Sequence, residues 1–529
     1  MSVLAHPMKF IAGLFSDKGL TRKAYLNALT VMLEYGASLI VGFIITPLMV
    51  AGLGNYTYGL WQVLNRLIGY ITPASGRPGF ALKATLANQQ ASTDYDQKRR
   101  YVGSTLVIWL LFLPLLVGVG GIVSWFVPSW VRAVGGYVWV ARAVSALLVT
   151  NVIVDALASI PQMTLQGENL GYKRMGLSML LVFIGGGYTW LALYLKMGII
   201  GVAAALAAAT LTNGLFFFWI ARSYTPWFGI ARPSLADTRE MLGRSWWFML
   251  WNLVTSLLLA SDVVVLGLLN SVESVTNYSL TRYVPETLIG VIVIVVFGIL
   301  PGLGGIIGTG DYARAVRLRE EINAFIWLAA TALGASILLW NQVFVGLWVG
   351  ADHYAGALPN LLIVVSAVQL ALIRSDGNII DLTLKLSQKV LLGLLSVTVS
   401  VAAASLLVGY FKLGIVGLCL GIMAGRLIIS IGYPVLISRF LGVSLTAQLS
   451  HWLRPAVVTV LLFLAALGLA YTLPSNAFAG WAGWAAFLGL AALTGLLALA
   501  ISFLTGLSSE QRTVFLRRVR LLLSRGDAA

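Results

Sequence analysis

The sequence is dominated by apolar runs of about 20 residues that follow one another with short charged breaks. A run of this length suits a helix that crosses the hydrocarbon core of a membrane. Only 10% of the 529 residues are charged, whereas soluble proteins carry about 25%. Because so few charges cannot cover a water-exposed surface, the sequence predicts an all-α polytopic membrane protein.

The apolar runs predict about fourteen transmembrane helices. No polar linker of domain size separates them, so we expect one integral membrane body. The approximate bounds of the expected helices are 26–50, 57–78, 101–127, 138–164, 174–195, 198–221, 246–269, 278–308, 322–346, 357–383, 390–410, 414–437, 453–473 and 481–506.

Lysine and arginine lie almost wholly on one side of these expected helices. With the N-terminus in the cytoplasm, the external loops hold only Arg132, Lys196 and Lys412. The positive-inside rule therefore predicts that both termini are cytoplasmic. The net charge of +16 is then a topology signal, with room for contact with anionic lipid, and it requires no nucleic acid.

An internal repeat divides the chain. The segment 194–201 resembles the segment 410–417, so the two copies align at an offset of 216 residues. The same offset carries Arg66 onto Arg282 and Lys173 onto Lys389. Two repeats of six helices have the same orientation, which predicts pseudo-symmetric lobes about an axis along the membrane normal. The alternative is a chance likeness between glycine-rich helix starts.

The predicted organisation has six parts. The tail after Ser508 carries Val514 and Phe515 at helical spacing among arginines, which predicts an amphipathic helix on the inner leaflet; a solvated basic tail is the alternative. The parts are a cytoplasmic N-terminal segment (1–25), an N-lobe (26–222), a cytoplasmic linker (223–245), a C-lobe (246–440), two further helices (441–507) and the basic amphipathic tail (508–529).

Arginines inside the expected helices are the strongest signal of a binding site. Each costs about 2.5–3.5 kcal/mol near the bilayer centre, so each needs water, a partner or a ligand. Arg426 has no acid on its own helix, Arg66 and Arg282 are related by the repeat, and Arg374 precedes a segment with glycine and asparagine. A water-filled cavity lined by Arg66, Arg282, Arg374 and Arg426 would suit an anion, because guanidinium groups match phosphate oxygens in pairs.

Acidic residues inside the expected helices are fewer. Glu34 and Asp155 are candidates for proton or sodium coupling. Asp262 is a third candidate, although it could instead neutralise Arg282 in a structural ion pair.

Catalysis and cofactors are not expected. No external loop exceeds about a dozen residues, whereas membrane enzymes that act on lipid-linked sugars need catalytic groups on a larger loop. No Walker-type phosphate loop occurs, and one cysteine with three scattered histidines predicts neither a disulfide nor a metal site.

The sequence resembles the polysaccharide-biosynthesis branch of the multidrug/oligosaccharidyl-lipid/polysaccharide exporter superfamily. The segment 46–61, with a proline closing the first expected helix and a Gly-Leu-Gly turn before the second, carries the resemblance first. It continues through the segment 262–267, Asn277-Tyr278 and Pro301. These motifs cover most of the first twelve expected helices.

The resemblance implies a flippase of the bacterial inner membrane. Such proteins move undecaprenyl-pyrophosphate-linked oligosaccharides to the outer leaflet by alternating access between two six-helix bundles. The pyrophosphate would then bind the four arginines, while Asn65 and Tyr283 contact sugar and the polyprenyl tail stays among membrane lipids. A polysaccharide polymerase and chain-length machinery are the implied protein partners.

Three other functions stay open. An ion-coupled multidrug or organic-cation antiporter of the same fold would place acids and aromatics in its cavity. A membrane glycosyltransferase or polymerase would carry a sizeable external loop. A non-transporting lipid-binding scaffold would not need arginines inside the membrane on both lobes.

Overall fold

The computed structural model describes residues 20–76, 78–382, 386–442, 444–473, 478 and 480–517. Segment 1–19 of the expected N-terminal part and the tail from residue 518 on lie outside the described residues. The described part of the chain consists of helices joined by short turns, and it contains no strand. The all-α fold is therefore confirmed.

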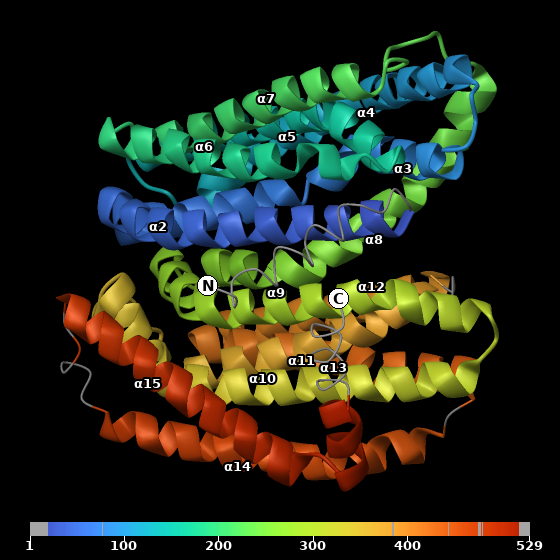
Figure 1. Cartoon of the computed structure of the whole chain (residues 1–529). Coiled ribbons are helices and arrows are strands. Elements are labelled where there is room, and N and C mark those ends of the chain that lie inside the picture. The colour runs from blue at the N-terminus through green and yellow to red at the C-terminus, as the bar shows by residue number, and fades with distance from the viewer. Residues whose placement is uncertain are drawn as a thin grey trace, which may run out of the picture. The chain divides into compact units, whose positions relative to one another are not determined.

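The chain forms two compact units, of which the first spans Lys18–Thr276. In this unit α5 packs on α4 and α7, and α6 packs on α2 and α7 (Figure 1). The elements of the first unit are α2 (Leu20–Gly69), the 3-10 turn η1 (Thr72–Ser75), α3 (Pro78–Asn88), α4 (Tyr95–Trp130), α5 (Tyr137–Gly167), η2 (Gly171–Arg174), α6 (Met175–Tyr194), α7 (Gly198–Tyr224) and α8 (Leu235–Leu269).

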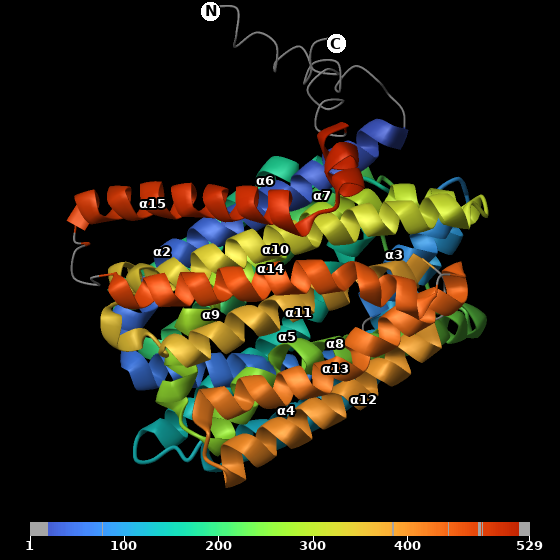
Figure 2. The same cartoon turned by 90° about the horizontal axis from the view of Figure 1, so that it is seen from below.

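The second unit covers the chain from Asn277 on. Here α11 packs on α10 and α13, while α14 and α15 flank α10 (Figure 2). Its elements are α9 (Val272–Gly308), α10 (Tyr312–Trp348), η3 (Ala351–His353), α11 (Ala357–Leu382), α12 (Leu386–Ser405), the π-turn η4 (Leu406–Tyr410), α13 (Gly414–Leu441), α14 (Leu445–Thr472), α15 (Gly480–Ile501) and the π-turn η6 (Ser502–Gly506). Residues 509–517 are also helical, as expected for the start of the tail.

Among the described residues, 12 helices are long and apolar enough to cross a membrane. They confirm a multi-pass membrane protein. The expected helix 278–308 lies within α9. The expected helix 26–50 and the first part of the expected helix 57–78, as far as Gly69, run together in α2, with a kink at Gly54, whose φ is 76° and ψ 168°.

The expected helix 57–78 is interrupted in its second half. The helix ends at Gly69, and the turn η1 follows before α3 begins at Pro78. Pro73 and Pro78 lack the N–H that a continuous helix would use, and Gly76 takes a left-handed φ of 73°. The sequence carried these signals, but hydropathy alone does not register them.

The repeated segment has the same backbone conformation in both copies. Lys196 and Lys412 have φ values of 54° and 56°, and Gly198 and Gly414 have values of 61° and 53°. Each pair is separated by the repeat offset. The order of helix packing also recurs: α4 with α5, α5 with α7 and α6 with α7 in the first unit correspond to α10 with α11, α11 with α13 and α12 with α13 in the second.

The packing boundary falls one helix later than the expected boundary between lobes. Helix α8, which the repeat assigns to the C-lobe, packs on α2, α3 and α4 in the first unit. The pseudo-symmetric relation of the two halves stays a prediction.

Candidate functional site

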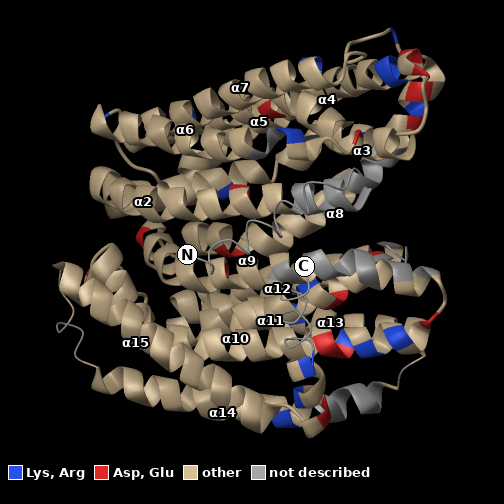
Figure 3. Ribbon diagram, viewed as in Figure 1, with Lys and Arg blue, Asp and Glu red and all other residues tan. Residues whose placement is uncertain are grey.

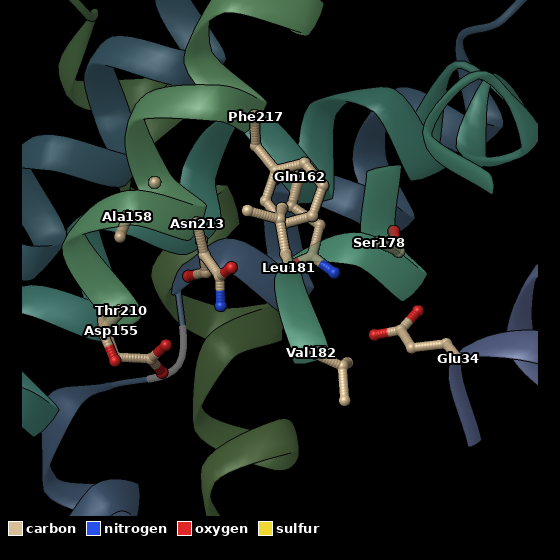
Figure 4. Close-up of a pocket in the computed structure, with 12 residues that line it drawn as sticks. Glu34, Asp155, Ala158, Gln162, Ser178, Leu181, Val182, Thr210, Asn213 and Phe217 are labelled. Atoms are coloured by element: carbon tan, nitrogen blue, oxygen red, sulfur yellow. The ribbon is translucent and has the colours of Figure 1, made fainter. Parts of the chain in front are cut away.

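A polar cavity lies among α2, α5, α6 and α7 of the first unit. It has a volume of about 110 Å³, enough for several water molecules. Its walls carry two carboxylates, two amides and three hydroxyl groups on helices that are otherwise apolar. The lining residues are Glu34, Asp155, Ala158, Ser159, Gln162, Ser178, Leu181, Val182, Thr210, Asn213, Gly214 and Phe217 (Figure 4).

Small residues let these helices pack closely beside the cavity, which brings its polar side chains together. A Cβ on Gly214 of α7 would stand 2.6 Å from the Cβ of Ala158 on α5. A Cβ on Gly186 of α6 would stand 2.6 Å from a methyl carbon of Val41 on α2. Any larger side chain at either glycine would therefore push the helices apart and separate the polar groups.

The two carboxylates face the cavity from different helices. Figure 4 shows Glu34 on one side and Asp155 on the other, with Asn213 and Gln162 between them in this view. Asp155 is exposed on its helix and Glu34 is partly exposed, so both are accessible. Carboxylate, amide and hydroxyl oxygens suit a hard cation or a proton rather than a soft metal.

The described residues contain no group of three or more His, Cys, Asp and Glu that could hold a metal ion. The cavity itself holds two carboxylates with neutral amide and hydroxyl oxygens around them. This set of groups suits a single positive charge. Sequence reasoning singled out Glu34 and Asp155 but missed Gln162 and Asn213. Gln162 follows Asp155 by two helical turns on α5, and this spacing was the available signal.

A second polar group in the first unit involves α2 and α8. Asp262 is only 4% exposed and accepts a hydrogen bond from the backbone N–H of Val263 at 2.8 Å. Arg66 is partly buried on α2, the helix against which α8 packs. Asn65, beside Arg66, is exposed.

In the second unit, Arg282 is held on its own helix. Its Nε and Nη2 each lie 3.1 Å from a carboxylate oxygen of Glu286. Its Nη1 donates to the hydroxyl of Tyr278 at 3.2 Å. Tyr283, the next residue, packs against Trp348 with ring centroids 4.4 Å apart and the ring planes tilted by 38°.

Arg426 lies between α13 and α11. It is 6% exposed, and its Nη1 donates to Ser366 Oγ at 2.8 Å. Nearby, Gln369 donates to the hydroxyl of Ser430 at 3.2 Å. These contacts give Arg426 a packing role between the two helices, and its contact with substrate stays a prediction.

Arg374 is partly buried on α11, close to an ion pair that sequence reasoning missed. Arg319 of α10 makes two hydrogen bonds to Asp376, of 3.0 and 3.1 Å. The two residues lie on different helices, 57 positions apart, so no local sequence pattern joins them.

Residues 25–306 match the polysaccharide biosynthesis protein family. The match covers more than half of the chain. The chain belongs to this family.

Solved structures show the fold of this polysaccharide biosynthesis family protein. It is similar to an inward-facing multidrug resistance MATE family transporter of the MOP superfamily, with a TM-score of 0.62 and 15% identity over 79% of this chain and 98% of that one. The outward-facing form of such a transporter gives a TM-score of 0.56 and 16% identity, over 80% of this chain and 96% of that one.

A MOP superfamily transporter from Pyrococcus furiosus, described as having a binding pocket of reversed polarity, matches with a TM-score of 0.54 and 15% identity. It is covered over 96% of its length, and this chain over 80%. No curated protein matches the sequence. The chain is thus a polysaccharide biosynthesis family protein whose fold is that of the MOP superfamily transporters it resembles.

Proposed function

We propose that this transporter moves a polyprenyl-pyrophosphate-linked oligosaccharide from the cytoplasmic to the outer leaflet for cell-surface polysaccharide synthesis. The observation that carries the proposal is the match of residues 25–306 to the polysaccharide biosynthesis family on a transporter fold. Undecaprenyl is the polyprenyl that the resemblance implies. The bacterial inner membrane, cytoplasmic termini, and a polymerase with chain-length machinery as partners are parts of the same proposal.

The pyrophosphate would be recognised by arginine. Arg66 and Arg374 are partly buried side chains on apolar helices, and a guanidinium can bind two phosphate oxygens at once. Arg282 would have to exchange Glu286 for the head group, which the exposure of that glutamate side chain (53%) makes feasible. Asn65 and Tyr283 would contact the sugar.

The cavity of Glu34 and Asp155 would couple transport to a proton or sodium gradient. A cation that binds there removes negative charge from among four apolar helices, and this lowers the cost of closing the helices around the site. Release to the opposite side restores the charge and favours opening. Binding of the cation on one side of the membrane and its release on the other would in this way drive alternating access.

The test is rescue of a strain that lacks its own lipid-linked oligosaccharide flippase. Wild-type protein should restore surface polysaccharide, and Asp155→Asn and Glu34→Gln should lower export at least tenfold at matched abundance. Asp352→Asn, the same change on the exposed turn η3, is the control and should behave as wild type. Failure of the wild-type protein to rescue any such strain would overturn the proposal.

The carboxylate cavity also supports a second function, the ion-coupled export of organic cations. The MATE transporters that share the fold are described as multidrug resistance proteins. An ethidium efflux assay separates the two functions. Dye export that depends on Asp155, without rescue of polysaccharide, would favour the antiporter.

A further inference from the structure

Helices α4 and α5 pack on each other and form a hairpin, with a turn at residues 131–136. Between Arg100 and Asp155 the only charged residues of the sequence are Arg132 and Arg142, near this turn. Figure 3 shows many charged residues of the first unit at the other end of α4, where this helix begins. The positive charge near the turn is therefore not neutralised from within the hairpin.

Arg142 of α5 lies over an aromatic ring of α4. Its Cζ is 4.1 Å from the ring centroid of Trp125, a distance typical of a cation–π contact. Its Nε is buried and has no hydrogen-bond acceptor. The side chain as a whole is partly exposed, so the terminal nitrogens of the guanidinium are accessible.

No described residue accepts a hydrogen bond from Arg142 or forms an ion pair with it. A guanidinium has five N–H donors and stays charged. An arginine within an apolar helix needs water, a partner or a ligand to offset its cost. The acceptor for Arg142 must therefore come from outside the described part of the chain.

The exposed face of α4 shows where this acceptor lies. Five apolar side chains, each between 41% and 62% exposed, recur along α4 at spacings of three, four or seven residues. They form one stripe along the helix, and an apolar stripe of this length faces lipid. The five residues are Val107, Leu111, Leu115, Ile122 and Trp125. The Trp125 ring, with the guanidinium over it, is thus reached from the lipid side.

The depth of the pair corresponds to the lipid head groups. Trp125 lies five residues before the end of α4 and Arg142 five residues after the start of α5, which is about 7.5 Å along each helix. Rings of this kind mark the membrane–water interface. The exposed aromatic residues at this end of the hairpin are Trp125, Phe126, Trp130, Tyr137 and Trp139.

We propose that Arg142 and Trp125 bind one phospholipid of the outer leaflet, with the guanidinium on the lipid phosphate and the Trp125 ring against the start of the acyl chains. A guanidinium fork matches two phosphate oxygens. An anionic lipid such as phosphatidylglycerol is favoured, because the exposed Arg132 adds a second positive charge near the turn. The choice of leaflet rests on the orientation in the proposed function, whereas the contact itself does not.

Native mass spectrometry of the purified protein, titrated with phosphatidylglycerol in detergent, tests the site. The wild type should retain one lipid more tightly than all others. Arg142→Gln should raise the apparent Kd of this lipid roughly tenfold, as expected when hydrogen bonds to a charged group are lost. Arg142→Lys should fall between the two, because an ammonium lacks the planar fork. Lys196→Gln, which removes an exposed cation in the turn between α6 and α7, is the control and should bind as the wild type does.

A pair of tryptophan variants tests the ring. Trp125→Leu should raise the apparent Kd severalfold, since the guanidinium loses the ring that supports it. Trp139→Leu is the matched control: Trp139 is 71% exposed at the same end of the hairpin, and no described cation lies over its ring. Equal Kd values for the two variants would mean that any exposed tryptophan serves, and the site as proposed would be wrong.

Three other results would also overturn the proposal. The first is unchanged phosphatidylglycerol binding by Arg142→Gln. The second is a bound lipid that inorganic phosphate displaces, which indicates a free-anion site, or that diacylglycerol replaces equally well, which indicates an apolar contact alone. The third is a dimer that dissociates in Arg142→Gln, because a second copy would then cover this face. No readout requires transport, so a failed rescue would count only against the proposed function.

Discussion

Removal of the Lys98 ammonium tests a buried ion pair at the start of α4, which lies against Trp227 in the connection from α7 to α8 (residues 225–234). Lys98→Met keeps the length and apolar stem of the side chain but leaves the Glu168 carboxylate without its partner at 2.9 Å. The Lys98 side chain is 2% exposed and that of Glu168 13%, so little water can replace the lost bond. Breaking a buried pair on one side costs about 3–5 kcal/mol.

The ion pair itself should contribute far less to the free energy of unfolding than the single variant loses. Lys98→Met/Glu168→Leu removes both charges, and replacement of a buried ion pair by apolar groups is often close to neutral. We therefore expect the double variant to recover most of the lost stability. Lys412→Met, the same change at an exposed turn residue, is the control and should stay within about 0.5 kcal/mol of wild type.

The assay is unfolding of the purified protein in mixed micelles of detergent and dodecyl sulfate, followed by tryptophan fluorescence. The Lys98 Nζ lies 5.6 Å from the ring centroid of Trp227, so the signal is sensitive to the surroundings of this ion pair. If Lys98→Met were as stable as wild type, the ion pair would not support the fold. If the double variant were no better than the single one, the loss would come from packing of the lysine stem.

Three further predictions follow from the contacts above. Asp376→Asn should destabilise the second unit by about 3–5 kcal/mol by breaking its pair with Arg319, which thermal unfolding measures against Asp352→Asn. Ser366→Ala removes the 2.8 Å hydrogen bond to Arg426, which should cost about 1.5–3 kcal/mol of stability. Arg426→Ala should in addition abolish export at matched abundance. Equal export by the two variants would leave Arg426 with a packing role alone. Asp237 forms a capping box with Ser234 at the start of α8, and its carboxylate lies 3.2 Å from Arg100 Nε. Burial raises the pKa of Asp237, but these contacts outweigh that effect and hold the pKa below its ordinary value. Its contribution to stability is therefore present above the unfolded pKa of about 3.9 and is lost as the pH falls through the folded pKa. Protection of the start of α8 from hydrogen exchange should accordingly be constant from pH 8 to 5 and fall below about pH 4.

The helices were predictable because a chain in lipid must satisfy its backbone hydrogen bonds within each span. Hydropathy alone therefore located the helices from α4 to α15, although α8, α10 and α14 begin at Leu235, Tyr312 and Leu445, before the expected starts at 246, 322 and 453. It failed at the segment after Gly69, where Pro73 and Pro78 break the expected helix 57–78. There, the prolines, which lack a backbone N–H, determine where the helix ends, and hydropathy does not register them.

The candidate site was predictable only in part. Glu34 and Asp155 stand out as charges within apolar runs, and both line the cavity. The ion pair of Lys98 and Glu168 joins residues 70 positions apart, and each lies in a charged break that reads as ordinary cytoplasmic loop. No local pattern distinguishes a buried cation there from a solvated one.

The same left-handed turn occurs twice in the chain, so one substitution can be compared at two positions. Lys196 and Lys412 hold φ values of 54° and 56°, a conformation that costs a residue other than glycine about 1–2 kcal/mol. Lys196→Gly and Lys412→Gly should relieve the same strain in two different surroundings. Any difference between the two gains would measure how the surroundings of each turn change the energetic cost of its left-handed lysine.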